Sequence, residues 1–223
     1  LDSKGIDLSA AILHNLSFKR AVMATGMLST LMTMLRGCKT VRAMWIVRCI
    51  ANMSATLKTR TALAKERTLV TQLTMLMRSG GDAADKVQKY CAFAICNILS
   101  TFMDKTILEE LLKDAKGNTD KGGTIGDLVV VTQLRVNDPY TKESLGKALF
   151  NLLARKDFRP RMVDIGVMDA LINLGNIELV ELLELSARVL YNMSCEVPTN
   201  IGYAERLGKK IKAPGLLIGR ITS

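Results

Sequence analysis

Five short segments decide the fold of this chain, and each is centred on an asparagine: AILHNLS (11–17), CIANMS (49–54), AICNIL (94–99), ALFNLL (148–153) and VLYNMS (189–194). The central residues are Asn15, Asn52, Asn97, Asn151 and Asn192. Successive asparagines lie 37, 45, 54 and 41 residues apart. This spacing is close to the period of about 40–47 residues that is typical of stacked helical repeat units. The spacing therefore predicts a repeat protein.

The positions around each asparagine are alike in all five segments. Apolar residues stand three before, two before and one after it; two before it, for example, are Leu13, Ile50, Ile95, Leu149 and Leu190. On a helix these three positions share one face, because each residue turns the chain by about 100°. Each segment is therefore predicted to be a helix with one buried stripe and the asparagine at its edge.

The rest of the chain also favours helices. Only four prolines interrupt it, 48% of its residues are hydrophobic and 4% are aromatic. The stretch 18–26 is a short segment ending in glycine, followed by a longer apolar one over 27–37, and the same order returns at 158–166 and 167–175. A glycine after a helix is a frequent C-cap, so these stretches predict a short helix followed by a longer one.

These features resemble the armadillo repeat, whose units consist of a short helix, a glycine, a second helix and a third helix ending in Leu-x-Asn-Leu-Ser. The resemblance covers essentially the whole chain. It implies an all-α, right-handed superhelical armadillo solenoid of three-helix repeats, of the kind found in catenins and importins. We expect a single domain over 1–223, made of partial repeats 1–17 and 196–223 around full repeats near 18–54, 55–99, 100–154 and 155–195.

Two features of this division carry further expectations. The longest spacing is explained by a glycine- and charge-rich insertion over 114–124, which we expect to be an exposed loop between helices. Both ends of the chain fall inside repeats, and solenoids need polar capping units at their ends. We therefore expect a fragment of a longer array that can associate through its uncapped ends.

The resemblance also implies a binding surface. In armadillo proteins the third helices line a concave groove, and their asparagines hydrogen-bond the backbone of an extended peptide. An amide side chain suits this role because it offers both a donor and an acceptor. The five repeat asparagines occupy the matching positions. The alternative is that some of them cap helix ends or tie neighbouring turns together.

Specificity is expected from residues one and two turns earlier on the same face. Four before the asparagine, cations stand at three of five sites, Arg48, Lys147 and Arg188, and Phe93 stands at a fourth. Seven before it are Trp45 and Tyr90, as apolar anchors. Import receptors typically carry tryptophan at the first of these positions, so this sequence departs from them and looks more like the catenin type. The alternative is that the cations are ordinary solvated residues.

The function that follows is a protein-interaction scaffold or adaptor that holds an extended acidic or phosphorylated segment in a groove of asparagine and arginine or lysine. A net charge of +10 agrees with an acidic partner. Two alternatives stay open. The chain could be a structural solenoid that docks by its outer surface, for example in a cytoskeletal or motor assembly, or the regulatory arm of a larger protein.

Other chemistry finds little support. His14 is the only histidine and no zinc spacing is present among the five cysteines, so we expect no metal, no cofactor and no enzymatic activity. The run over 117–124 lacks the lysine of a phosphate-binding loop. No basic and aromatic platform favours nucleic acid, and no apolar run reaches the roughly 18 residues of a membrane span. The odd cysteine count indicates an intracellular, reducing and cytoplasmic location, with cytoskeletal or nuclear association left open.

Overall fold

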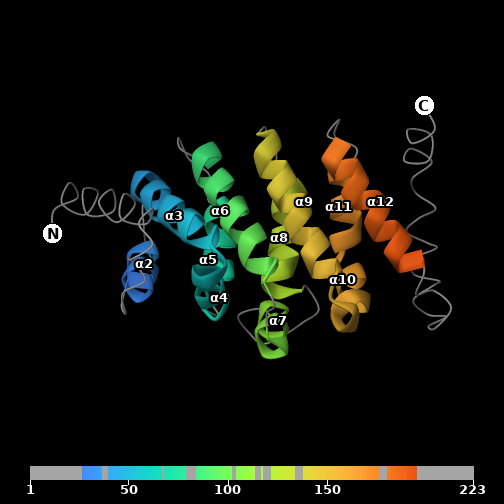
Figure 1. The fold of residues 1–223 in the computed structure, drawn as a ribbon, viewed down its shortest axis with the longest axis horizontal. Coiled ribbons are helices and arrows are strands. Elements are labelled where there is room, and N and C mark those ends of the chain that lie inside the picture. Colours follow the sequence, from blue (N-terminus) through green and yellow to red (C-terminus); the bar gives the residue numbers. More distant parts are fainter. Residues whose placement is uncertain are drawn as a thin grey trace.

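The computed structural model describes residues 27–36, 40–66, 68–78, 84–101, 104–113, 117, 122–133, 138–175 and 180–194. Within these residues there are eleven α-helices and one 3-10 turn, and no strand. In chain order they are α2 (Met27–Leu35), α3 (Thr40–Ser54), α4 (Leu57–Ala64), α5 (Leu69–Arg78), α6 (Ala84–Leu99), α7 (Lys105–Leu111), α8 (Gly123–Gln133), α9 (Pro139–Leu153), η1 (Lys156–Phe158), α10 (Arg159–Ile165), α11 (Val167–Gly175) and α12 (Val180–Ser194) (Figure 1). The predicted all-α architecture is confirmed.

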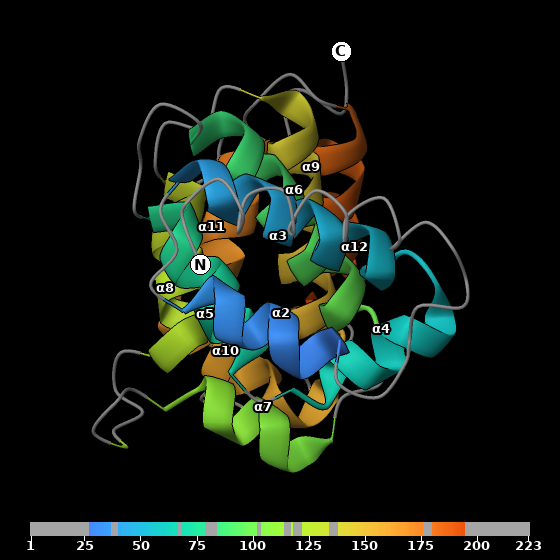
Figure 2. The ribbon, with the colours of Figure 1, turned by 90° about the vertical axis from the view of Figure 1, so that its left-hand side faces the viewer.

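The helices stack in rows. The helices that carry the asparagine segments, α3, α6, α9 and α12, lie side by side in chain order and are called the front row below. Behind them α8 packs against α5 and α11, α5 packs against α6, and α11 packs against α9 and α12, while the short helices α4, α7 and α10 lie along one edge (Figure 1). A view from one end of the array separates these layers (Figure 2). The molecule is an elongated helical solenoid.

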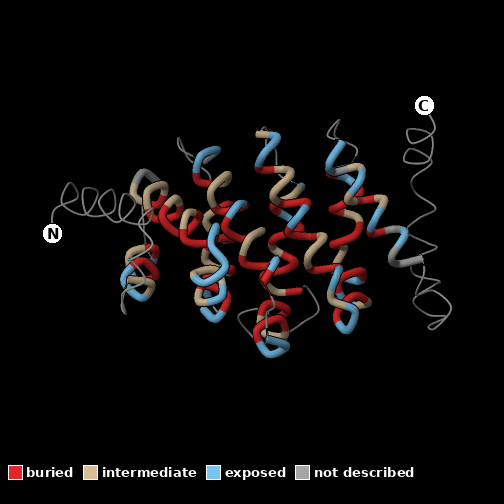
Figure 3. The backbone as a smooth tube through the Cα atoms, in the orientation of Figure 1, coloured by how far each residue is buried: buried red, intermediate tan, exposed pale blue. Residues whose placement is uncertain are grey.

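One continuous core runs between the rows (Figure 3). The stripe expected around each asparagine is buried wherever the structure describes it. Its residues, each at most 4% exposed, are Cys49, Ile50, Met53, Ala94, Ile95, Ile98, Ala148, Leu149, Leu152 and Val189. Fully burying a leucine- or isoleucine-sized side chain contributes about 1.5–3 kcal/mol. No helix buries its stripe alone, so neighbouring repeats stabilise one another.

Several helix ends are set by their local sequence. The Asp104 carboxylate accepts a hydrogen bond from the backbone N–H of Thr106, at 3.0 Å, at the start of α7. Asp138 accepts one from the N–H of Thr141, at 2.7 Å, at the start of α9. Caps of this kind contribute about 0.5–2 kcal/mol. Between α10 and α11 the chain turns at Gly166, whose φ of 92° is the left-handed conformation expected of a C-cap glycine.

The insertion differs from its expectation at its C-terminal end. The range 114–124 was expected to be an exposed loop throughout, and this is wrong for its last residues. Gly122 is buried, α8 begins at Gly123, and Thr124 is buried and hydrogen-bonded to the Thr71 hydroxyl at 2.8 Å. The reason is steric: Gly123 has a φ of 51°, and a Cβ there would lie 2.2 Å from the Lys113 carbonyl oxygen. Only glycine lets the chain pass so close to α7.

Arginine side chains hydrogen-bond to the last backbone carbonyls of two front-row helices. The sequence did not predict these contacts. The Arg60 Nε donates to the Ser54 carbonyl oxygen at the end of α3, at 2.8 Å. The Arg159 Nε makes the same contact with the Leu153 carbonyl at the end of α9, at 2.7 Å, and the Arg159 side chain is buried. Each arginine stands six residues after its acceptor. A cation at a helix C-terminus satisfies carbonyls that lack an intrahelical partner and favours the helix dipole.

Two further hydrogen bonds from arginine side chains join neighbouring repeats. The Arg155 guanidinium, which follows α9, donates to the Thr101 carbonyl just beyond α6, at 2.7 Å. Arg60 also reaches forward, and its Nη1 donates to the Ser100 hydroxyl at 3.1 Å. The ends of α3, α6 and α9 are therefore linked along one edge of the solenoid by arginine side chains.

Candidate functional site

The described asparagines lie at equivalent places on three neighbouring front-row helices: Asn52 on α3, Asn97 on α6 and Asn151 on α9. The amide nitrogen of Asn97 donates to the Ser54 hydroxyl of the preceding repeat, at 3.0 Å. That of Asn151 donates to the Cys96 carbonyl of the preceding repeat, at 3.5 Å. The second of these is at the outer limit of a hydrogen bond. Both asparagines therefore tie adjacent repeats together.

These contacts leave further hydrogen-bond donors and acceptors on the side-chain amides of Asn97 and Asn151. A side-chain amide has two N–H donors and a carbonyl oxygen with two lone pairs. One N–H of Asn97 is directed to the preceding repeat. Of the remaining predicted asparagines, Asn15 lies outside the described residues, and Asn192 falls on α12 with its side chain outside them. Their part in a groove stays a prediction.

Arg48 on α3 is held between two aromatic rings. Its guanidinium carbon lies 5.8 Å from the centre of the Trp45 ring and 5.6 Å from that of the Tyr90 ring on α6. Both distances are within the range in which a cation is attracted by a ring face. Among the described residues no carboxylate forms an ion pair with Arg48. The rings orient the guanidinium while leaving its charge uncompensated.

The other two predicted cations each have a carboxylate partner four residues earlier on their own helix. The Lys147 ammonium is hydrogen-bonded to Glu143, and this bond raises the pKa of Lys147 although partial burial opposes it. The Arg188 Nη1 lies 3.9 Å from Glu184, and its guanidinium carbon is 5.6 Å from the ring centre of Phe150 on α9. Exposed pairs of this kind contribute about 0.2–1 kcal/mol. Their charge is therefore partly neutralised.

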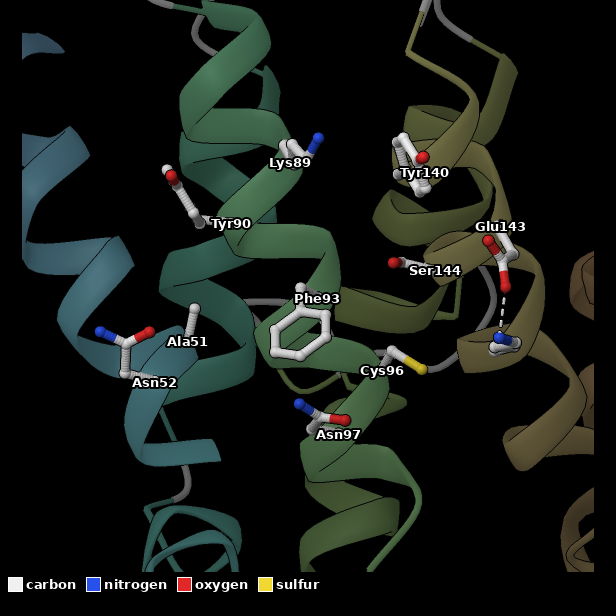
Figure 4. A pocket seen from close by; sticks show the side chains of 11 residues that line it. Ala51, Asn52, Lys89, Tyr90, Phe93, Cys96, Asn97, Tyr140, Glu143 and Ser144 are labelled. Carbon is white, nitrogen blue, oxygen red and sulfur yellow. Dashed lines mark hydrogen bonds and ion pairs between the residues drawn. The ribbon is translucent and has the colours of Figure 1, made fainter. Parts of the chain in front are cut away.

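A hollow of about 540 Å³ opens on the front row across α3, α6 and α9 (Figure 4). Phe93, 43% exposed, stands in its middle, with Ala51 and Asn52 on one side and Cys96 and Ser144 on the other. Its lining residues are Ala51, Asn52, Lys89, Tyr90, Phe93, Cys96, Asn97, Tyr140, Glu143, Ser144 and Lys147. The structure thus brings predicted residues Asn52, Asn97, Tyr90, Phe93 and Lys147 around one cavity. It places Trp45, Arg48, Asn151 and Arg188 outside its lining.

Six lining residues were not among the predicted site residues: Ala51, Cys96, Ser144, Lys89, Tyr140 and Glu143. Of these, Lys89, Tyr140 and Glu143 stand eight, eleven and eight residues before their asparagines. These spacings continue the stripe of positions four and seven before the asparagine by one further turn. The same count along the helix would have found them.

Lys89 and Tyr140 form the upper rim of the hollow together with the cap of α9. The Lys89 ammonium lies 4.6 Å from the centre of the Tyr140 ring and 3.6 Å from an Asp138 carboxylate oxygen. Partial burial acts to raise the pKa of Asp138, but hydrogen bonds from Thr141 and the charge of Lys89 prevail and hold that pKa below its usual value. The charge of Lys89 at this rim is therefore compensated by Asp138, as the charges of Lys147 and Arg188 are by Glu143 and Glu184.

The thiol of Cys96 lies on the floor of the hollow. Burial raises the pKa of Cys96 to about 11, although the charges of Lys147 and Arg60 act in the opposite direction. The thiol is therefore protonated at neutral pH and has little nucleophilic character. Among the described residues no three His, Cys, Asp or Glu side chains are grouped in a way that could hold a metal ion. In the same part of the chain, none of the helices has the length and apolar character that crossing a bilayer requires.

Two solved structures resemble this one closely in shape. One is a designed armadillo repeat protein, solved in complex with the peptide (KR)4; it matches with a TM-score of 0.72 and 16% identity over 100% of this chain and 87% of that one. The fold is armadillo-like. The other is an engineered protein, with a TM-score of 0.67 and 20% identity over 94% of this chain and 81% of that one. No protein-family model and no curated protein matches the sequence.

The armadillo-like fold predicted from the asparagine segments is thus confirmed. The front row here corresponds to the helices on which the resemblance placed a peptide groove. The boundaries of the individual repeats stay a prediction.

Proposed function

We propose that this armadillo-like solenoid is an interaction scaffold that holds an extended acidic segment of another protein across its front row. The observation that carries the proposal is the state of Arg48. Its guanidinium is oriented by two aromatic rings and has no carboxylate partner among the described residues. A planar guanidinium can form two parallel hydrogen bonds with a carboxylate or a phosphate. A glutamate, an aspartate or a phosphorylated residue fits this position.

The asparagines support an extended backbone in the same place. Asn97 lies beside Tyr90 and Phe93 in the lining of the hollow. One amide N–H of Asn97 donates to Ser54. Its second N–H can donate to a peptide C=O, and its amide oxygen can accept from a peptide N–H. Such pairing is independent of the ligand's side chains, so affinity would come from the backbone and selectivity from charge.

The charge of the ligand is the point at which this chain differs from its designed relative. That protein was solved with (KR)4, a cationic peptide. In this chain the front row carries Arg48, Lys147 and Arg188, and the sequence has a net charge of +10. Like charges repel, so we propose a ligand of opposite charge. A protein partner is proposed rather than nucleic acid, and the reducing, cytoplasmic location stays a prediction.

The test is a double charge reversal, Arg48→Glu and Arg188→Glu, with binding of a fluorescent glutamate-rich peptide followed by anisotropy. Loss of the charge-assisted contact at Arg48 should cost about 1.5–3 kcal/mol, and loss of the partly neutralised Arg188 should add about 0.2–1 kcal/mol, so binding should weaken by at least about tenfold. Raised salt should weaken the wild-type complex. Circular dichroism should be unchanged, because the Arg48 and Arg188 side chains are outside the buried core.

A matched control makes the same change of net charge elsewhere. Lys58 on α4 and Arg161 on α10 are exposed and stand outside the front row. The variant Lys58→Glu, Arg161→Glu should bind as wild type does. If the front-row variant bound as tightly as the control, the front row would be the wrong surface. Docking by the outer surface, or a regulatory role in a larger protein, would then replace the proposal.

A further inference from the structure

The residue directly before each repeat asparagine differs in size along the front row. It is Ala51 on α3, Cys96 on α6 and Phe150 on α9. All three face the next helix: Ala51 and Cys96 line the hollow, and Phe150 carries the guanidinium of Arg188 from α12 over its ring. The position is therefore the floor of the interval between two front-row helices.

The size of this residue differs between two intervals of the front row. Between α9 and α12 the floor is the ring of Phe150, partly buried against the core and covered by Arg188. Between α6 and α9 it is the small thiol of Cys96, and the wall opposite is Ser144. The hollow lies where these small residues stand, and Phe93 and Tyr140 supply apolar sides (Figure 4). Its floor carries no ionised group, because the Cys96 thiol is protonated at neutral pH.

We propose that the part of the hollow between α6 and α9, over Cys96, is a side-chain pocket for one apolar residue of the bound segment, such as leucine. This inference rests on the proposed function, because the same segment places its acidic residue on Arg48. The cations at the rim of the pocket, Lys89 and Lys147, are paired with Asp138 and Glu143. Arg48 is therefore the residue that binds the acidic side chain of the segment, and it lies beside a pocket that selects an apolar side chain.

The geometry sets the spacing of the two ligand residues. Arg48 stands between α3 and α6, and the pocket stands between α6 and α9, which is one helix farther along the row. Packed helix axes are about 8–10 Å apart, and an extended chain advances about 3.3 Å per residue. The acidic and apolar residues are therefore about three positions apart. The partner's segment has the form acidic–x–x–apolar, or its reverse.

The proposal can be tested with synthetic peptides that carry one glutamate and one leucine separated by none to five glycine or serine residues. Binding to the full chain should be tightest near two intervening residues. Replacing leucine by alanine in that peptide should weaken binding about tenfold, as the loss of a buried aliphatic group does. A peptide with glutamate alone should bind more weakly and show no preference for position.

A variant copied from the chain itself closes the pocket. Cys96→Phe places on α6 the residue that α9 carries at the equivalent position. It should remove the tenfold advantage of leucine over alanine, measured as the ratio of the affinities of the two peptides for the same variant. Ser144→Phe fills the same space from the opposite wall, and it keeps the test decisive if the first variant fails to fold by circular dichroism.

A measurement on the unaltered chain locates the leucine. Cys96 is half-buried, so slow alkylation at Cys96, mapped by mass spectrometry, should be suppressed by the leucine peptide and not by the alanine peptide. Equal protection by both peptides, or an unchanged leucine advantage in both filled variants, would overturn the pocket and leave the scaffold proposal intact. Absence of binding by every acidic peptide would overturn both.

Discussion

The cation in the first interval of the front row, between α3 and α6, has different partners from the cations in the intervals that follow it. In the first, Arg48 is held by the rings of Trp45 and Tyr90. In the later ones, Lys89, Lys147 and Arg188 also lie near rings or carboxylates, but each has an acidic partner within 4 Å. Aromatic rings orient a cation without neutralising it, whereas a carboxylate does both. Counting cations along a groove therefore overstates its attraction for an acidic ligand.

The largest expected effect tests this difference directly. Arg48→Ala should weaken binding of a glutamate peptide by about 1.5–3 kcal/mol, since an uncompensated charge-assisted contact is lost. Lys147→Ala should cost only about 0.2–1 kcal/mol, because Lys147 already has Glu143 as a partner. Titration calorimetry of the two variants against the same peptide measures both.

Removing Glu143, the acidic partner of Lys147, tests the same difference between the two intervals. Glu143→Gln should release the charge of Lys147 and strengthen binding of the peptide, bringing the later intervals nearer to the first. Equal losses in Arg48→Ala and Lys147→Ala, with no gain in Glu143→Gln, would show that the two intervals do not differ.

A smaller effect concerns how firmly the intervals are joined. Asn97 ties α6 to the end of α3 at 3.0 Å, whereas the corresponding contact from Asn151 to Cys96 is 3.5 Å. Asn97→Ala should lower the free energy of unfolding by about 1 kcal/mol, the net contribution of one hydrogen bond, and Asn151→Ala by clearly less. Urea unfolding followed by circular dichroism gives both values. The reverse order would contradict the assignment of the stronger joint to the first interval.

The smallest effect is the acid sensitivity of the second interval. The pKa of Asp138 is lowered, so its ionised form stabilises the fold above its unfolded pKa of about 4. That stability is lost as the pH falls through the lower folded value. Asp138→Asn keeps a capping oxygen but loses the pairing with Lys89. It should cost about 0.2–1 kcal/mol at neutral pH, and the difference from wild type should vanish in acid. Melting temperatures measured from neutral pH to pH 2 would show whether the gap closes.

Local periodicity made most of the fold predictable. The stripe around Asn52, Asn97 and Asn151 follows from a spacing of 3.6 residues per turn, and every described member of it is buried. The turn at Gly166 follows from the preference of C-caps for glycine. Both depend only on residues within about one turn of each other.

The candidate site was less predictable, for two reasons. The pairing of Lys147 with Glu143 follows from their four-residue spacing in the sequence, but the predicted groove included only the positions four and seven before each asparagine. The hollow over Cys96 was not visible, because its opposite wall, Ser144, comes from another repeat 48 residues later. Contacts at that separation depend on how the repeats stack, which no local pattern specifies.

The arginine contacts at the ends of the front-row helices have a consequence for how such a chain can change over time. Arg60, Arg155 and Arg159 donate to backbone carbonyls of Ser54, Thr101 and Leu153. A carbonyl is present whatever side chain the acceptor residue carries, so a substitution there leaves the joint in place. Neighbouring units can therefore diverge in sequence, or be duplicated, without matching changes across the joint.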